Sequence, residues 1–180
     1  MGASKVSRER GTWKPKTEIV IDFRGAEPVS KGSMKAFIPR GGKFPVITDS
    51  HASELRVFER DIRLIATREM DRRALPCATH QPFELHAVFY LPRAAGHFTV
   101  ANALKPTAPA TPWGKPDWDK LSRAAGDAMT GIVYDDDCRI VRAVIEKRFA
   151  TADRDVGMWI RLRVLPGSIA EVAAAAQLTL

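Results

Sequence analysis

The chain has 180 residues, of which 45% are hydrophobic and 27% charged, and its formal net charge is +7. These are values of one globular domain with its own core, and they exclude a chain that is disordered throughout. The positive charge favours a polyanionic partner, most simply nucleic acid.

The cysteines, histidines and apolar runs indicate which kinds of site and which cellular compartment to expect. The two cysteines, Cys77 and Cys138, lack CxxC spacing, so neither a disulfide framework nor a zinc site is predicted, and a reducing interior fits them. The four histidines show no metal-ligand spacing. There is no hydrophobic signal core and no apolar run of roughly 18 residues, which predicts a cytoplasmic protein without membrane contact.

The predicted elements begin after a basic segment. Residues 1–17 are rich in Lys, Arg, Ser and Gly and are expected to form a flexible basic arm. Periodicity then predicts strands over 18–23, 83–91, 140–149 and 156–165, a hairpin of 34–38 with 44–48, and helices over 50–74 and 119–129. Residues 18–167 would form the domain, and 168–180 a tail or short helix.

One connection in this pattern is unusually long. Residues 94–116 show no clear period and are rich in Ala, Pro and Thr. Connections of this length are uncommon inside compact domains. We therefore expect the segment to contain a short helix or to lie across a functional surface.

Acidic residues gather in the second half of this basic chain. Asp117 and Asp119 lie at the start of the predicted helix, where unpaired backbone N–H groups favour negative charge. The simplest alternative to a functional role is that one of these two aspartates only caps the helix and the other is an ordinary surface acid. A helix of ten residues rises about 15 Å, and an extended segment from Thr130 to Asp136 spans roughly 23–25 Å. The chain can therefore bring Asp137 beside the other two.

Strand alternation also predicts the direction in which the Asp137 side chain points. It puts Asp137 on the same face as Val141, Ala143 and Ile145, which we expect to pack under the helix. Three close carboxylates repel one another unless a cation lies between them, and all-oxygen ligation selects Mg²⁺ or Mn²⁺. A calcium loop of the EF-hand type is excluded by the spacing.

The residues around these acids resemble a known family. The acids lie in two runs, Lys115-Pro116-Asp117-Trp118-Asp119-Lys120-Leu121 and Asp127-Ala128-Met129-Thr130-Gly131-Ile132-Val133-Tyr134-Asp135-Asp136-Asp137-Cys138-Arg139-Ile140-Val141, and Lys147 follows the second run. This set of residues is similar to the pattern of the RusA-type Holliday-junction resolvases. Those proteins carry a KPDxDNL segment, a helix ending in DALNG, and a VYxDDxQI strand with a later lysine.

The resemblance implies both a fold and an activity. The fold would be α+β, a two-layer single domain with helices packed on one face of a mixed sheet. The activity would be that of a homodimeric endonuclease, from a phage or prophage in a bacterial host, which cuts four-way DNA junctions by paired symmetric nicks with Mg²⁺ or Mn²⁺. By this match Asp117, Asp119 and Asp137 are the catalytic metal ligands, and Asp136 is an adjacent one.

Basic residues predict how DNA would be held. The candidates for phosphate contacts are Lys31, Lys35, Arg40, Lys43, Lys120, Arg123 and Lys147. The chain departs from the family pattern at Lys120, where Asn is usual, and at Arg123, where Lys is frequent. Arginine keeps the charge but holds phosphate bidentately rather than as a point charge.

Two tryptophans flank the acids. Trp113 is a candidate for stacking on unpaired bases, whereas Trp118 is expected in the core. Two other functions remain open at this point. One is a non-catalytic DNA-binding module in which the acids only cap and pair; the other is a metal nuclease that acts on flaps or forks.

Overall fold

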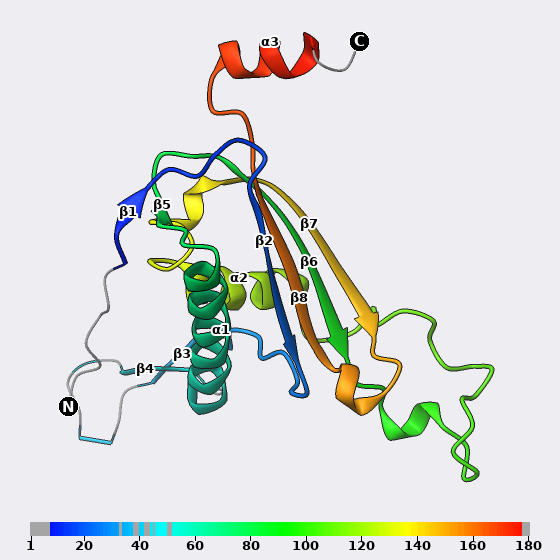
Figure 1. Ribbon diagram of the computed structural model, residues 1–180. Helices are drawn as coiled ribbons and strands as arrows, with labels where there is room; N and C mark the ends of the chain where they lie inside the picture. Colours follow the sequence, from blue (N-terminus) through cyan, green and yellow to red (C-terminus); the bar gives the residue numbers. More distant parts are fainter. Residues whose placement is uncertain are drawn as a thin grey trace.

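The computed structural model describes residues 8–32, 34–37, 40–41, 44, 46–49 and 52–177. Its largest unit is a four-stranded sheet with the strand order β2–β8–β6–β7 (Figure 1). These strands are β2 (Glu18–Arg24), β6 (Phe83–Leu91), β7 (Ile140–Phe149) and β8 (Gly157–Val164). The β6–β7 pair is parallel and the other pairs are antiparallel, so the sheet is mixed.

Two helices cover one face of this sheet. They are α1 (Ala52–Arg72) and α2 (Trp118–Met129), which lie on the same side of the strands (Figure 1). The buried face of α1 is formed by Leu55, Phe58, Ile62, Ala66 and Met70, and it packs with alternate residues of β2, β6 and β8 in one core. The predicted α+β fold with helices on one face of a mixed sheet is confirmed.

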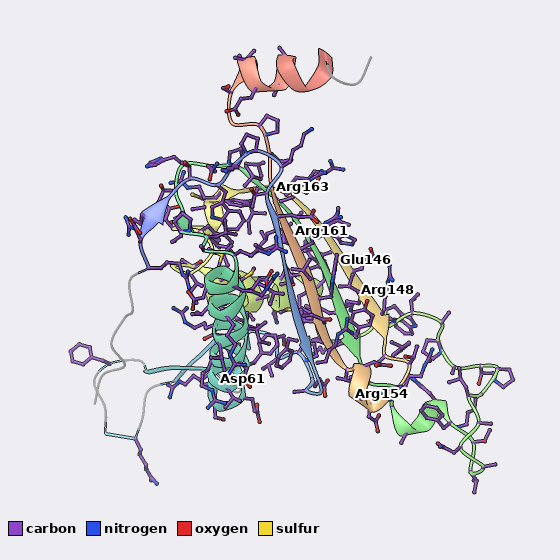
Figure 2. The ribbon with its side chains drawn as sticks, viewed as in Figure 1. Asp61, Glu146, Arg148, Arg154, Arg161 and Arg163 are labelled. Carbon is purple, nitrogen blue, oxygen red and sulfur yellow. The ribbon has the colours of Figure 1, made fainter. Side chains whose placement is uncertain are left out.

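The opposite face of the sheet is polar. Figure 2 shows Glu146 and Arg148 on β7, and Arg161 and Arg163 on β8. Arg163 pairs with Glu84 at 2.9 Å and Arg148 pairs with Glu146, so much of the charge on this face is matched locally. The Arg163–Glu84 pair joins the neighbouring strands β8 and β6, whereas Arg148 and Glu146 both lie on β7. Both kinds of pair are expected on the solvated face of a sheet.

The N-terminal segment differs from the flexible arm predicted over residues 1–17. Strand β1 (Arg10–Gly11) pairs in parallel with β5 (Cys77–Ala78). Trp13 is buried against Phe83, with ring centroids 5.2 Å apart, and its Nε1 donates to the carbonyl oxygen of Pro76 at 2.8 Å. Residues 8–17 therefore belong to the folded body, while residues 1–7 lie outside the described part.

The remaining elements are short. Strands β3 (Met34–Phe37) and β4 (Val46–Asp49) form the predicted hairpin, although Lys43 in its turn lies outside the described residues. Single 3₁₀ turns are η1 (Ala95–His97), η2 (Asp137–Arg139) and η3 (Asp153–Asp155). The tail contains α3 (Ile169–Gln177), as the short-helix expectation stated. Within the described ranges, no helix is long and apolar enough to cross a membrane.

The long connection before α2 projects from the body of the protein (Figure 1). We call residues 92–116 the projecting loop. It contains the short helix that its length predicts, η1, and a bridge between Phe98 and Leu104. Its base is fixed at the end of β7, where the Arg93 guanidinium lies 4.0 Å from the ring centroid of Phe149. The loop then enters α2 through Pro116.

Candidate active site

The start of α2 presents two carboxylates to solvent. Asp117 occupies the N-cap position with extended backbone angles, but its side chain makes no capping hydrogen bond. The simple cap alternative therefore fails for Asp117. Its carboxylate instead lies 3.2 Å from Nζ of Lys120, and Asp119 lies 3.3 Å from Nη2 of Arg123. Both carboxylates are close to half exposed and available to a ligand.

The packing of α2 explains this presentation. Leu121, Ala124, Ala125, Ala128 and Met129 are buried, so the helix has one apolar stripe against the core. Asp119 and the two cations lie off that stripe. The pairs Asp117–Lys120 and Asp119–Arg123 have the i,i+3 and i,i+4 spacings at which neighbours on a helix surface meet. The residues that depart from the family pattern are thus the partners of the two acids.

Lys147 fixes the segment that leads into α2. Its Nζ donates to the carbonyl oxygen of Gly114 at 2.6 Å and to that of Pro116 at 3.0 Å. The Lys115–Pro116 peptide between these carbonyls is cis. In this structure Lys147 therefore joins β7 to the backbone immediately before Asp117, a role that the sequence did not indicate.

The second acidic group lies just before β7. Asp136 caps η2 by accepting a hydrogen bond from the backbone N–H of Cys138 at 2.9 Å, which lowers the pKa of its carboxyl. Asp135 binds Arg139 through both carboxylate oxygens, and hydrogen bonding from that side chain lowers the pKa of Asp135. Asp137 is exposed and follows directly.

The path between the two acidic groups differs from the extended return we expected. After α2 the chain turns tightly, and the N–H of Gly131 donates to the carbonyl oxygen of Tyr134 at 2.7 Å. The buried hydroxyl of Tyr134 donates to Gly126, and the N–H of Asp135 donates to Ala78. The chain is therefore held near the C-terminal end of α2 when it reaches Asp137.

This path separates the predicted metal ligands within one protomer. Helix α2 is about 18 Å long, and Ile140 to Lys147 spans about 23 Å of strand. Because Lys147 contacts Pro116, Asp117 and Asp119 lie toward the far end of β7 from Asp137. Throughout the part of the chain that is described, no group of three or more His, Cys, Asp or Glu side chains is placed to hold a metal ion.

The expected packing of β7 under the helix also needs correction. Val141 is 63% exposed and Ala143 is exposed, whereas Ile145 is partly buried against the core. The first half of β7 is thus uncovered, and it forms an edge of the sheet. The chemistry of the acids suits a hard cation. One protomer, however, does not gather Asp117, Asp119, Asp136 and Asp137 around it.

The predicted DNA-binding residues have different settings. Lys31 forms an ion pair with Asp127, and its N–H donates to the carbonyl oxygen of Lys120 at 3.3 Å, which holds the loop after β2 against α2. Arg40 is exposed. Of Lys35 only the backbone, in β3, is described, and Lys43 lies outside the described residues.

Both tryptophans beside the acids are on the surface. Trp113 is 83% exposed and Trp118 is 60% exposed. The core position predicted for Trp118 is therefore wrong, because α2 begins at this residue, beyond the part of the helix that packs in the core. Sequence reasoning also missed a hollow beside Trp113, although the length of the projecting loop pointed to a functional surface there.

Comparison with known proteins adds a family to this geometry. The family model described as endodeoxyribonuclease RusA matches residues 29–161. The matched range includes both acidic groups, the whole of α2 and all of β7. No curated protein matches the chain.

Proposed function

The chain belongs to the RusA family of endodeoxyribonucleases, and on that basis we propose that it resolves four-way DNA junctions as a homodimer, by paired symmetric nicks that depend on Mg²⁺. The observation that carries the proposal is the extent of the family match, which spans Asp117, Asp119 and Asp137 together with the elements that position them. The net charge of +7 supports a polyanionic substrate. We expect the enzyme to act in the cytoplasm of a bacterial cell and to be encoded by a phage or prophage.

The metal ligands in this proposal come from two protomers. Asp117 and Asp119 of one protomer would meet Asp136 and Asp137 of its partner. The separation of these groups within one chain supports this arrangement, because among the described residues no three His, Cys, Asp or Glu side chains are placed to hold a metal ion. When bound, Mg²⁺ or Mn²⁺ supplies positive charge against the phosphate and makes water a better nucleophile at neutral pH.

Strand β7 is the surface through which we propose that the protomers pair. It is an edge strand, so one row of its backbone N–H and C=O groups faces away from the sheet. Val141 and Val144 are exposed on it, one on each face of the strand, so the edge carries apolar side chains beside its unpaired backbone groups. A second copy of the same strand can cover both features in a two-fold symmetric contact.

The direction of this pairing matters for the acids. In a two-fold antiparallel pair, opposite residues point to the same side of the sheet, so the pair is centred on one residue. With Val144 at the centre, Val141 of one protomer lies opposite the partner's Lys147. That end of the partner's strand holds the segment before Asp117, by the hydrogen bonds of Lys147. The contact therefore brings the Asp137 end of each chain toward the Asp117 end of the other, and it creates two equivalent sites.

The cations beside the acids have a defined part in the proposal. Lys120 and Arg123 pair with Asp117 and Asp119, which reduces repulsion between those carboxylates and an approaching phosphate. When the carboxylates engage a metal ion, the same cations become available to the DNA backbone. Arg123 can then hold a phosphate through two donors.

A cleavage assay tests the function. Wild-type protein and Asp119→Asn are incubated with Mg²⁺ and either a mobile four-way junction, a flap or a plain duplex. The proposal expects the wild type to cut the junction into paired nicked products and the variant to bind it without cutting. Equal cutting of plain duplex would overturn junction specificity, and preferential cutting of the flap would favour a flap nuclease. Absence of metal-dependent cutting would favour a DNA-binding module.

A further inference from the structure

A hollow of about 260 Å³ lies at the base of the projecting loop, directly before the acids of α2. Its wall includes Trp113, Pro116 and His97, together with Phe149 from the end of β7. Pro116 immediately precedes Asp117, so this wall and the first catalytic candidate are adjacent in the chain. A group held in the hollow is therefore next to the proposed reaction centre.

The hollow is held in shape by contacts from several elements. Lys147 binds the carbonyl oxygens of Gly114 and Pro116, while Arg93 donates to the carbonyl oxygen of Pro109 at 3.0 Å. The ring of His97 meets Phe149 edge-on, with centroids 5.5 Å apart. A cavity formed in this way is ready for a ligand and needs little ordering when one binds.

The chemistry of the wall selects a flat, largely apolar group. Trp113 exposes 83% of its surface although it lies in a fixed loop, and its neighbour Pro112 is buried. The volume is below the roughly 300–1,000 Å³ typical of pockets for larger organic ligands, so it suits one ring system. Every nucleobase has a π-face that stacks on tryptophan, whatever the sequence.

Charge at the hollow favours a base over a phosphate inside it. Glu27 is on the wall, and its carboxylate repels a phosphate but can accept a hydrogen bond from a base amino group. Lys115 is also on the wall and is exposed, where it can contact the phosphate of the same nucleotide. The Nδ1 atom of His97 is buried and, among the described residues, has no hydrogen-bond partner.

We propose that this hollow receives one unstacked nucleobase from the branch point, stacked on Trp113, and so places the adjoining phosphate at Asp117 and Asp119. The inference rests on the proposed function, because it concerns the DNA on which that activity would operate. A paired duplex keeps its bases stacked, whereas bases at a branch point are easier to release. The hollow would thus contribute to the choice of cleavage position.

Photocrosslinking tests the site without requiring cleavage. A four-way junction carries 5-iododeoxyuridine at each nucleotide around the branch point in turn, and the wild-type protein is irradiated with it in the presence of EDTA. The inference expects a crosslink mapped by mass spectrometry to Trp113 at one or two branch-point positions and none with the same base in duplex. A junction that binds but crosslinks elsewhere, or equally in duplex, overturns it.

Kinetics on two variants give the second readout. Trp113→Ala is expected to reduce junction cleavage roughly tenfold and to spread the cut positions along a mobile core, and Trp113→Phe to restore most of the wild-type pattern. Val100→Ala, in the same loop and fully exposed, is the matched control and should cleave like the wild type.

If Trp113→Ala keeps the wild-type rate and positions, the inference fails while the proposed nuclease function stands. If Trp113→Ala instead only weakens dimerisation, the hollow is a contact site for the partner protomer and the inference fails too. If the wild type never cuts a junction, the proposed function fails, and the crosslink alone decides the hollow.

Discussion

Lys147 reaches across 31 residues of sequence to donate a hydrogen bond to the carbonyl oxygen of Pro116 at 3.0 Å. With its second bond, to Gly114, it links the end of an edge strand to the backbone that carries Asp117 into α2. A lysine that the sequence offered as a DNA contact thus sets the position of a catalytic candidate.

Replacing this lysine tests the positioning role. Lys147→Met is expected to lower kcat for junction cleavage by up to about 10²-fold, because small displacements of a reacting group are costly, while junction affinity changes little. Lys147→Arg keeps donors and should recover part of the rate. Arg148→Met, on the next residue and pointing to the outer face, is the control. A pure loss of affinity with unchanged kcat would show that Lys147 acts as a DNA contact instead.

Mixing two inactive variants tests whether the metal ligands come from both protomers. Asp119→Asn and Asp137→Asn should each be inactive alone. In a mixed dimer with ligands contributed in trans, one site carries both substitutions and the other carries neither, so nicking of one strand returns. If both groups came from the same chain, the mixed dimer would stay inactive. The measurement is single-strand nicking of a labelled junction by tagged, purified mixed dimers.

The edge of β7 gives a prediction about assembly. Val141→Lys places a charge on the uncovered half of the strand and is expected to shift the protein toward monomer and to abolish cleavage together with dimerisation. Val57→Lys, on the exposed face of α1, changes the same residue type without touching β7 and should remain dimeric. Light scattering coupled to size exclusion measures both. Dimeric, active Val141→Lys protein would rule out pairing through this edge.

Asp135 is predicted to matter for stability rather than for catalysis. Arg139 holds its pKa below the usual range, so the pair contributes to the free energy of unfolding above about pH 4 and that contribution is lost as the pH falls through the lowered pKa. Asp135→Asn should cost about 1–2 kcal/mol at pH 7 and flatten the acid limb of the stability curve. Exposed Asp153→Asn is the control. Urea unfolding between pH 2 and 7 makes the comparison, and equal acid limbs would refute the prediction.

Local sequence patterns predicted most of the fold. Alternation such as that of Ile19 and Ile21, and helical spacing such as that of Leu55, Phe58 and Ile62, depend on which face of an element is buried, and the structure buries those faces. The acids at the start of α2 were located in the same way. Trp118 differs, because residue spacing indicates which face of a helix is buried but not where along the helix the packing stops, and α2 begins at this residue.

The return path after α2 could not be obtained from local sequence. It depends on Tyr134, which is buried and donates to Gly126, and on Ala78, which lies far away in the chain and accepts from Asp135. A length argument permits an extended return but cannot choose it over a turn. The described part of the expected flexible arm, residues 8–17, is folded instead, and local sequence could not show this for a similar reason. Trp13 is held by Pro76 and Gln81, which are distant in sequence.

The strand order has a consequence for how the protein is made. Strand β2, near the N-terminus, pairs with β8, and Glu18 stands opposite Arg163. No other named strand lies beside β2 in the described sheet. A ribosome must therefore release the chain through β8, which ends at Val164, before β2 can pair with it. Until then helix α1, which contacts β2, covers the apolar side of that strand. Such long-range pairing slows folding. We expect the nascent chain to depend on chaperones more than its modest length suggests.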